Sequence, residues 1–522
     1  MISRNIALVA ALIFSVSMIA NGEAAPVSSW VHSGKSGKLT YKQLSTGDKI
    51  VDFSYAGYGG GAVKIPNFSV KKSVAASGED DTAAIQKAID EVSGLPLVHG
   101  ARGAVLLQKG HFHCDGTLRL NAAGVVLRGS GIGADGTVIE MTGDPHLAIS
   151  VGGKTKILTT GAPTQVSDAY VPSGFQSLHV TDVSSFAVGD RVRITRPVTD
   201  KWLHFMGMDA LSRNGKKETW VSGELETVRT ITGIAGKKLI LDVPLTDSYD
   251  RAQLEPSGAT VAKVEESGAI TNIGIEDLGL SAPARKITLS DKAFNGLQMQ
   301  GVVDGWARNL QFVDTTEAVG IGRGSRRITI EKVDVVQSIS IQGAAKPADF
   351  SLNGTQTLID RCTATGDNVF YIATGPTMQG PNVVLHCIFR GNGHVQPHQR
   401  WSTGILIDSC DVPEGGIDLM NRGEMGSGHG WAMGWGVAWN NTAKSYLIQM
   451  PPGSANWAIG NRGQQLLSKM QTYGPGPEFP PLPQGFIESQ GTPVMPKSLY
   501  LQQLRDRLGV RVLKNMGFNA SE

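Results

Sequence analysis

A short strand-like unit returns six times between about residue 270 and residue 410. Each unit has a few alternating apolar residues before a polar turn, and the units end at Leu278, Leu310, Val333, Cys362, Cys387 and Cys410. The steps between these end positions are 32, 23, 29, 25 and 23 residues, which suits one coil of a parallel β-helix. The units are too short for two helices and lack a period of about 3.6 residues, which excludes a helical solenoid.

Three of these six end positions are cysteines, so the repeat places Cys362, Cys387 and Cys410 at one position of successive coils. Their side chains should stack inside the coil, spaced by the strand separation of about 4.8 Å. We therefore predict buried free thiols rather than disulfides. Cys114 has no evident partner.

Four segments nearer the start of the chain carry a family resemblance: residues 52–59, 80–89, 104–110 and 124–131. Together with the later coils they resemble the pectate-lyase superfamily, over roughly residues 50–150 and 265–465. The resemblance implies an all-β fold, a right-handed parallel β-helix whose open N-terminal end is capped by a short helix. Asp80 and Asp81 suit the start of that helix, because carboxylates satisfy its free N–H groups. The superfamily includes lyases, hydrolases and phage tailspikes.

The sequence divides into five parts. Residues 1–24 read as a signal peptide, 25–164 as the cap and first coils, and 251–465 as the main coils. Residues 165–250 interrupt the coil rhythm with antiparallel strand patterns, which predicts a small inserted β subdomain. Residues 466–522 combine a proline-rich linker with an amphipathic C-terminal helix over 498–516.

The predicted signal peptide places the mature protein in the periplasm or outside the cell. Arg4 precedes an apolar stretch over residues 6–20, and Gly22-Glu23-Ala24 supplies small residues for cleavage before Ala25. After its removal we expect no membrane segment. The net charge of +2 and the lack of a basic stripe argue against a nucleic-acid partner.

Residues 390–439 concentrate the side chains that suit chemistry on a sugar acid. This window holds three of the eleven histidines and four of the nine tryptophans. Arg390, His394, His398, Arg400 and Trp401 form a first group, and a second group one coil later contains Arg422, Glu424, His429 and Trp431. Equivalent points on neighbouring coils can converge on one groove, so we expect residues 390–401 and 421–431 to lie side by side.

Such a cluster suits β-elimination from a uronic acid, because the carboxylate must be neutralised and the enolate-like charge stabilised. We predict that Arg400 and Arg422 bind this charge, that His398 is the general base and that His429 is the second acid or base. Arg390, His394, Trp401, Glu424 and Trp431 are the predicted substrate-binding residues. The predicted partner is an acidic polysaccharide or oligosaccharide.

Two other functions remain open. A glycoside hydrolase needs a pair of carboxylates, for which Asp367, Asp418 and Glu424 are candidates. A non-catalytic carbohydrate-binding β-helix would explain the tryptophans but not the concentrated histidine and arginine.

The sequence requires no cofactor. Many β-helix lyases use Ca²⁺ held by acidic side chains, with arginine or lysine as base. Calcium is therefore conceivable here, but Asp360, Asp408, Asp411 and Glu414 are spread over different turns and predict no metal site. Lys346 is a further candidate base with no second feature beside it.

Overall fold

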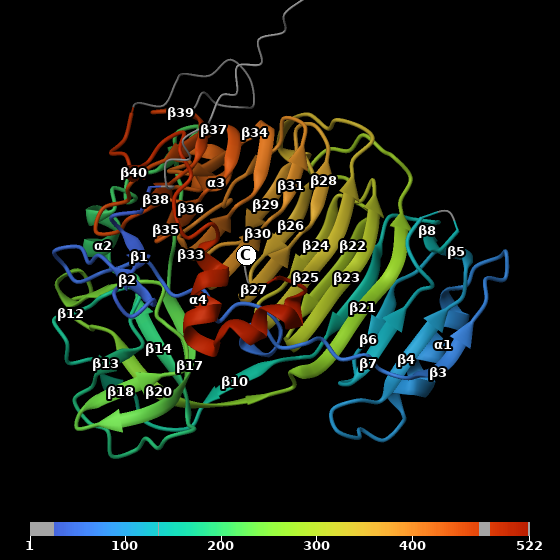
Figure 1. The fold of residues 1–522 in the computed structure, drawn as a ribbon, viewed down its shortest axis with the longest axis horizontal. Coiled ribbons are helices and arrows are strands. Elements are labelled where there is room, and N and C mark those ends of the chain that lie inside the picture. The colour runs from blue at the N-terminus through green and yellow to red at the C-terminus, as the bar shows by residue number, and fades with distance from the viewer. Residues whose placement is uncertain (1–25, 134, 469–480, 520–522) are drawn as a thin grey trace, which may run out of the picture.

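The computed structural model describes residues 26–133, 135–468 and 481–519. The predicted signal peptide lies outside these residues, as does most of the proline-rich segment. The described chain forms the predicted parallel β-helix, whose coils stack along one axis (Figure 1).

Each full coil contributes one strand to each of three parallel sheets, which we call A, B and C. Sheet A contains β3 (Val70–Val74), β4 (Gly103–Leu107), β7 (Val125–Arg128), the first parts of β21 (Ile270–Ser281), β23 (Val302–Val313) and β25 (Arg326–Val336), then β27 (Thr355–Asp360), β30 (Gln379–Leu385), β33 (Ser402–Asp408), β35 (Met433–Gly434), β36 (Val437–Trp439), β38 (Trp457–Ile459) and β40 (Phe486–Glu488).

Sheets B and C follow in the same coils. Sheet B contains β5 (Gly110–Cys114), β8 (Thr137–Met141), the second parts of β21, β23 and β25, then β28 (Thr363–Thr365), β31 (Ile388–Arg390) and the starts of β34 (Asp411–Leu419), β37 (Thr442–Ile448) and β39 (Arg462–Gln465). Sheet C contains β6 (Leu118–Leu120), β9 (Leu147–Gly152), β22 (Asn295–Gln300), β24 (Glu317–Ile321), β26 (Ala348–Leu352), β29 (Phe370–Thr374), β32 (His394–Val395) and the later parts of β34, β37 and β39.

The bend from sheet A to sheet B is made by one residue with positive φ in each coil. These residues are Asp277, Asn309, Lys332, Arg361, His386, Ser409 and Asn440, with φ between 50° and 60°. The next residue in each coil points inward, and the first six of these are the end positions of the sequence repeat. The repeat therefore marks a real corner of the solenoid.

The cysteine stack is confirmed. Cys362, Cys387 and Cys410 are buried free thiols, each just before a position paired in register across sheet B. The Cys387 Sγ lies 3.4 Å from the Leu385 carbonyl oxygen, and burial raises the pKa of this thiol well above its usual value. Cys114 is also free and buried.

Helix α1 (Thr82–Ser93) closes the N-terminal end of the solenoid, as the resemblance implied (Figure 1). Ile85, Ile89 and Val92 pack into the same core as the first coils. The Asp80 carboxylate accepts the Thr82 N–H at 3.1 Å, as predicted. The Asp81 carboxylate instead accepts the Ser77 N–H, outside the helix.

The inserted subdomain is larger than the sequence predicted. Its antiparallel strands are β10 (Lys156–Thr159), β11 (Thr164–Gln165), β12 (Tyr170–Val171), β13 (Ser177–His179), β14 (Arg191–Pro197), β15 (Ser212–Arg213), β16 (Lys216–Lys217), β17 (Glu224–Ala235), β18 (Lys238–Leu241), β19 (Tyr249–Asp250) and β20 (Thr260–Ser267), with helix α2 (Asp200–Phe205) between β14 and β15. β20 pairs with both β10 and β14, so the predicted limits of 165 and 250 fall inside the sheet. We call residues 156–267 the insert.

The outer face of sheet A is apolar and covered. Residues 30–56, which include β1 (Val31–Ser33) and β2 (Leu39–Tyr41), pack on it together with helix α4 (Leu499–Leu508). The predicted helix over 498–516 is broken at Gly509, where φ is +87°, and continues as a 3₁₀ helix over Val510–Met516. We call residues 30–56 and α4 the strap.

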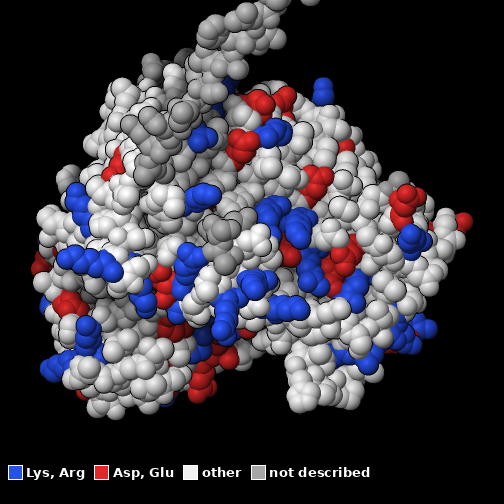
Figure 2. Space-filling view, in the orientation of Figure 1, with Lys and Arg blue, Asp and Glu red and all other residues white. Residues whose placement is uncertain are grey.

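On the face that carries α4, basic and acidic side chains lie side by side (Figure 2). This face therefore offers no continuous basic surface. Among the described residues, no helix is both long and apolar enough to cross a membrane.

Candidate functional site

The two segments singled out by the sequence do lie side by side. His398, Arg400 and Trp401 belong to the loop from β32 to β33, and residues 421–431 belong to the loop from β34 to β35, one coil further. The Arg400 N–H donates to the His429 carbonyl oxygen at 3.0 Å, and the Trp401 N–H donates to the Trp431 carbonyl oxygen at 2.9 Å. Both loops run along the edge where sheet C turns into sheet A.

His398 is held by Arg422. The Arg422 Nη1 lies 2.7 Å from the His398 Nδ1 and 2.8 Å from the His398 carbonyl oxygen. A guanidinium can only donate, so Nδ1 must accept and the ring hydrogen sits on Nε2. Burial, followed by the charge of Arg422, lowers the pKa of His398 to about 2. The predicted general base is thus arranged as a neutral N–H donor.

His429 packs beside His398 and is also neutral. Its ring centroid lies 4.8 Å from that of His398, and its Nδ1 is buried with no hydrogen-bond partner among the described residues. Burial, with Arg422 and Arg400 next in effect, lowers its pKa to about 3. His429 is therefore neutral near pH 7 and has a ring nitrogen that is not engaged.

Arg400 borders a cavity that Trp220 and Thr377 also line. Its Nη2 donates to the Ser427 carbonyl oxygen at 2.8 Å and to the Ser427 hydroxyl at 2.7 Å. Arg400 and Trp401 both have positive φ, at 55° and 57°, which is uncommon for two large residues in succession. Strained backbone of this kind clusters at functional sites, so the turn itself is a second reason to place a site here.

Lys346 joins the cluster from the opposite edge of sheet C. It precedes β26, is 8% exposed, and its Nζ lies 3.9 Å from the centre of the Phe370 ring. Phe370 packs edge-on against His398 at 4.7 Å, and the charge of Lys346 contributes to the low pKa of His398. We call His398, Arg400, Arg422, His429 and Lys346 the basic cluster.

His394 lies on sheet C beside the basic cluster but is engaged there. Its Nδ1 lies 2.9 Å from the carboxylate of Asp418, which also accepts the Gln396 amide at 2.6 Å. Asp418 is fully buried. This group orders the outer side of β34, next to the loop that carries Arg422.

Trp401 and Trp431 are packing residues, which corrects their predicted role as substrate contacts. Each is 3% exposed, and both belong to an apolar cluster with Trp202 and Trp220 of the insert. The Trp401 Nε1 donates to Asp247 at 2.9 Å, and the Trp431 Nε1 donates to the Met206 carbonyl oxygen at 3.1 Å. Their function is to fasten the insert to the β-helix.

Two further predicted substrate residues lie away from the basic cluster. Arg390 is on sheet B, where it pairs with Asp411 at 2.9 Å. Glu424 is exposed and precedes the short helix α3 (Met425–Gly428). Neither side chain has a contact with the two histidines.

Acidic residues form no evident metal site in the described parts of the chain, where no group of three or more His, Cys, Asp or Glu side chains is placed to hold an ion. The four carboxylates considered from the sequence as metal ligands each bind another group of the protein. Asp360 binds Arg361, Asp408 binds the start of α4, Asp411 binds Arg390, and Glu414 accepts the Gly391 N–H.

No protein-family model and no curated protein matches the chain. Similar solved structures include a tailspike protein from Pseudomonas phage LKA1, with 14% identity, 74% of this chain and 66% of that chain covered, and a TM-score of 0.37. A polygalacturonase from Erwinia carotovora has 12% identity, 79% and 98% coverage, and a TM-score of 0.36. The A-module of a mannuronan C-5 epimerase from Azotobacter vinelandii has 13% identity, 74% and 71% coverage, and a TM-score of 0.30. The chain spans just under two thirds of the tailspike's length.

Proposed function

We propose that this protein is a polysaccharide lyase, which cleaves a uronic-acid-containing polysaccharide by β-elimination outside the cytoplasm. The observation that carries the proposal is the pair of neutral histidines enclosed by guanidinium groups. His398 offers an N–H, the His429 ring packs beside it, and Arg400 supplies a positive charge to which a carboxylate can bind.

In the proposed reaction His429 removes the proton from C5 of the uronate. The C4–O4 bond breaks as a double bond forms between C4 and C5, and the His398 Nε2–H protonates the departing O4. Later exchange with water removes the proton from His429 and restores the one on His398. Arg400 stabilises the charge that develops on the carboxylate, and Arg422 acts as a positioning residue that fixes the His398 ring.

Substrate binding would also raise the pKa of His429. In the free protein, Arg422 and Arg400 both lower its pKa. A uronate carboxylate bound at Arg400 offsets these charges and raises the pKa of His429. His429 is then a stronger base with a substrate in place than without one, although burial, the largest cause of its low pKa, remains.

The other two functions have less support. Asp367 precedes β29 and Glu424 follows β34, at opposite edges of sheet C. A five-residue strand spans about 16 Å, whereas hydrolysis needs carboxyl groups roughly 5–9.5 Å apart. Asp418 is buried against His394 and Gln396. A simple binding protein would be expected to expose its aromatic rings, but Trp401 and Trp431 are packed inside.

Alginate, pectate, glucuronan and glycosaminoglycans provide the direct test. A lyase produces an unsaturated uronide that absorbs ultraviolet light, a hydrolase produces reducing ends without this absorbance, and a binder produces neither. His398→Ala and His429→Ala should each lower kcat by about 100-fold or more, because general acid–base catalysis contributes roughly that factor. Their melting temperatures should stay near that of the parent protein.

Arg390→Ala is the matched control, since Arg390 lies on sheet B and pairs with Asp411 at the surface. It should leave turnover unchanged. Full activity in either histidine variant would remove that residue from the mechanism, and absence of the ultraviolet product on every polysaccharide would rule out the lyase on these substrates.

A further inference from the structure

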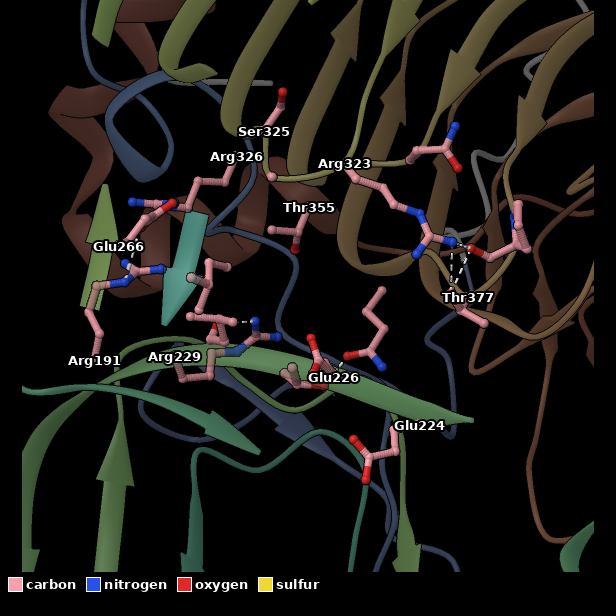
Figure 3. Close-up of a pocket in the computed structure, with 18 residues that line it drawn as sticks. Arg191, Glu224, Glu226, Arg229, Glu266, Arg323, Ser325, Arg326, Thr355 and Thr377 are labelled. Carbon is pink, nitrogen blue, oxygen red and sulfur yellow. Dashed lines mark hydrogen bonds and ion pairs between the residues drawn. The ribbon is translucent and has the colours of Figure 1, made fainter. Parts of the chain in front are cut away.

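A groove runs between the insert and the β-helix, along the turns that join sheet C to sheet A. One stretch has a volume of about 310 Å³ and lies between β17 of the insert and the turns at Arg323, Asn353 and Thr377 (Figure 3). A second stretch of about 540 Å³ ends at Arg400. Both stretches share Glu224, Arg323, Pro376 and Thr377, so they form one continuous groove.

The groove follows the axis of the solenoid. Its floor is built by the turns after β24, β26, β29 and β32, which belong to four successive coils. Coils are spaced by about 4.8 Å, so the backbones of Arg323 and Arg400, three coils apart, lie roughly 14 Å apart along the axis. The Arg323 guanidinium reaches Pro376, two coils further, and the Arg400 guanidinium reaches Ser427, one coil further, so the two charges are separated by two coils, roughly 10 Å. This length accommodates more than one sugar ring, and the end at Arg400 adjoins the basic cluster.

Basic side chains outnumber acidic ones along the groove. Its charged lining consists of six cations and four carboxylates: Arg191, Lys217, Arg229, Arg323, Arg326 and Arg400, with Glu218, Glu224, Glu226 and Glu266. Arg191 and Arg326 both bind Glu266, and Glu226 binds Arg193 outside the lining.

Two of the groove cations, Arg323 and Arg400, lie on the turns of the β-helix and bond only to neutral atoms. Arg323 donates to the Pro376 carbonyl oxygen at 2.9 Å and to the Thr377 hydroxyl at 3.2 Å, both of which are neutral. Arg400 likewise donates to neutral atoms of Ser427. Within the described residues neither guanidinium has a carboxylate partner. Each is therefore able to form a charge-assisted contact with an anion.

We propose that this groove binds the part of the acidic polysaccharide that lies away from the bond being cleaved. Arg323 holds the carboxylate of one uronate, while Arg400 holds that of the uronate being cleaved. This inference rests on the proposed function and extends it, because a groove open along its length favours cleavage within long chains. The insert is then part of substrate recognition as well as of the fold.

Glu224 constrains how the polysaccharide lies in the groove. It is exposed on β17 and lines both stretches of the groove, and Figure 3 shows it on the side of the groove opposite Arg323 and Thr377. A carboxylate at this point repels a sugar acid but accepts hydrogen bonds from hydroxyl groups. The chain should therefore present hydroxyls to Glu224 and carboxylates to the arginines.

The test compares Arg323→Ala with the parent protein on whichever polysaccharide is cleaved, using the intact polymer and the shortest oligosaccharide that is still cleaved. Arg323→Ala should raise KM for the polymer about tenfold, the effect of one lost charge-assisted contact, and leave kcat unchanged. The shortest oligosaccharide should show no change in KM. Glu224→Gln should lower KM for the polymer, because it removes the repulsion of the sugar acid while its amide oxygen still accepts hydrogen bonds.

Arg511→Ala serves as the control, because Arg511 is exposed in the 3₁₀ helix after α4 and is not among the groove residues. Equal effects of Arg323→Ala on short and long substrates, or no effect on the polymer, would overturn the proposal. If no polysaccharide is cleaved, the proposed function fails but the groove can still be tested by affinity electrophoresis in pectate or alginate. There, retardation of the parent protein and its loss in Arg323→Ala support the groove, and equal migration of the two overturns it.

Discussion

His398 and His429 link the chemistry of the site to the stability of the fold. Their pKa values are lowered to about 2 and about 3, whereas an unfolded histidine has a pKa of about 6.5. Below pH 6.5 each of these two sites binds more protons in the unfolded chain than in the folded one, so the contribution of the two histidines to the free energy of unfolding should fall as the pH falls. The buried carboxyls of Asp349, Asp360 and Asp408, whose pKa values are raised to about 7, about 7 and about 6, contribute in the opposite direction. Each histidine contributes at most about 1.4 kcal/mol per pH unit to this slope.

Urea unfolding between neutral pH and about pH 5 measures this contribution. Relative to the parent protein, His398→Asn should remove close to one histidine's share from the change in the free energy of unfolding between these two pH values, because the buried site no longer resists protonation. His99→Asn is the control: His99 is exposed and has positive φ, which asparagine tolerates. An unchanged slope in His398→Asn would mean that this site is more open to water than its packing against Phe370 and Arg422 implies.

The residues of the basic cluster were predictable in part. Their adjacency followed from the coil spacing, but their roles did not, because the tautomer of His398 depends on where the Arg422 side chain ends. Lys346 reaches His398 across sheet C from 52 residues earlier, a separation that no local pattern encodes. Trp401 and Trp431 looked like sugar platforms because their partners, Trp202 and Trp220, lie about 200 residues away in the sequence.

Helix α4 depends on one carboxylate of the β-helix. Asp408, at the end of β33, accepts the Ser498 hydroxyl at 2.7 Å and the Tyr500 N–H at 2.8 Å, so it satisfies the start of the helix. Burial raises the pKa of Asp408 to about 6. Asp408→Ala should lower the free energy of unfolding by about 1.5–3 kcal/mol, the range for hydrogen bonds to charged groups.

Urea unfolding and limited proteolysis check this prediction together. In Asp408→Ala the bonds on either side of α4 should be cut sooner, since the helix is held less firmly on sheet A. Asp411→Ala changes the same residue type three positions later, but its carboxylate pairs with Arg390 at the surface. Such exposed pairs contribute between 0 and about 1 kcal/mol. Equal losses of unfolding free energy in the two variants would contradict the role of Asp408 in holding the start of α4.

At the level of elements, the repeat predicted the corners of the solenoid better than the limits of the insert. Each repeat unit ends beside a residue with positive φ, so the bend between sheets A and B recurs at a fixed place in the repeat. A bend of this kind depends on neighbouring residues, which is why the sequence pattern could predict it. β10 and β20 begin and end the insert, yet their alternating pattern is the same one that a coil strand has. They are distinguished only by their antiparallel pairing across more than 100 residues.

The whole molecule is reinforced unevenly along its axis. Towards the C-terminal end, the strap covers sheet A from Leu358 to Ile459 and ties several coils together. Towards the N-terminal end, the outer side of sheet A is covered by a much smaller cluster around Phe68 and Trp306. Among the described strands, those of the first coils pair with the rest of the solenoid through β21 and β22. A solenoid gains its stability from such contacts between neighbouring coils, so this end should open first.

Alkylation of the four cysteines can show which end of the solenoid opens first, because these thiols are buried in different coils along the axis. Cys114 is on β5 in the first coils, whereas Cys387 lies between two further cysteines beneath the strapped coils. Without denaturant, none should react with a thiol-alkylating reagent, since burial raises the pKa of both Cys114 and Cys387. Across a urea series, peptide mapping should find Cys114 alkylated at a lower concentration than Cys387. Simultaneous alkylation of all four would instead mean that stacking and the strap unite the whole solenoid into one cooperative unit.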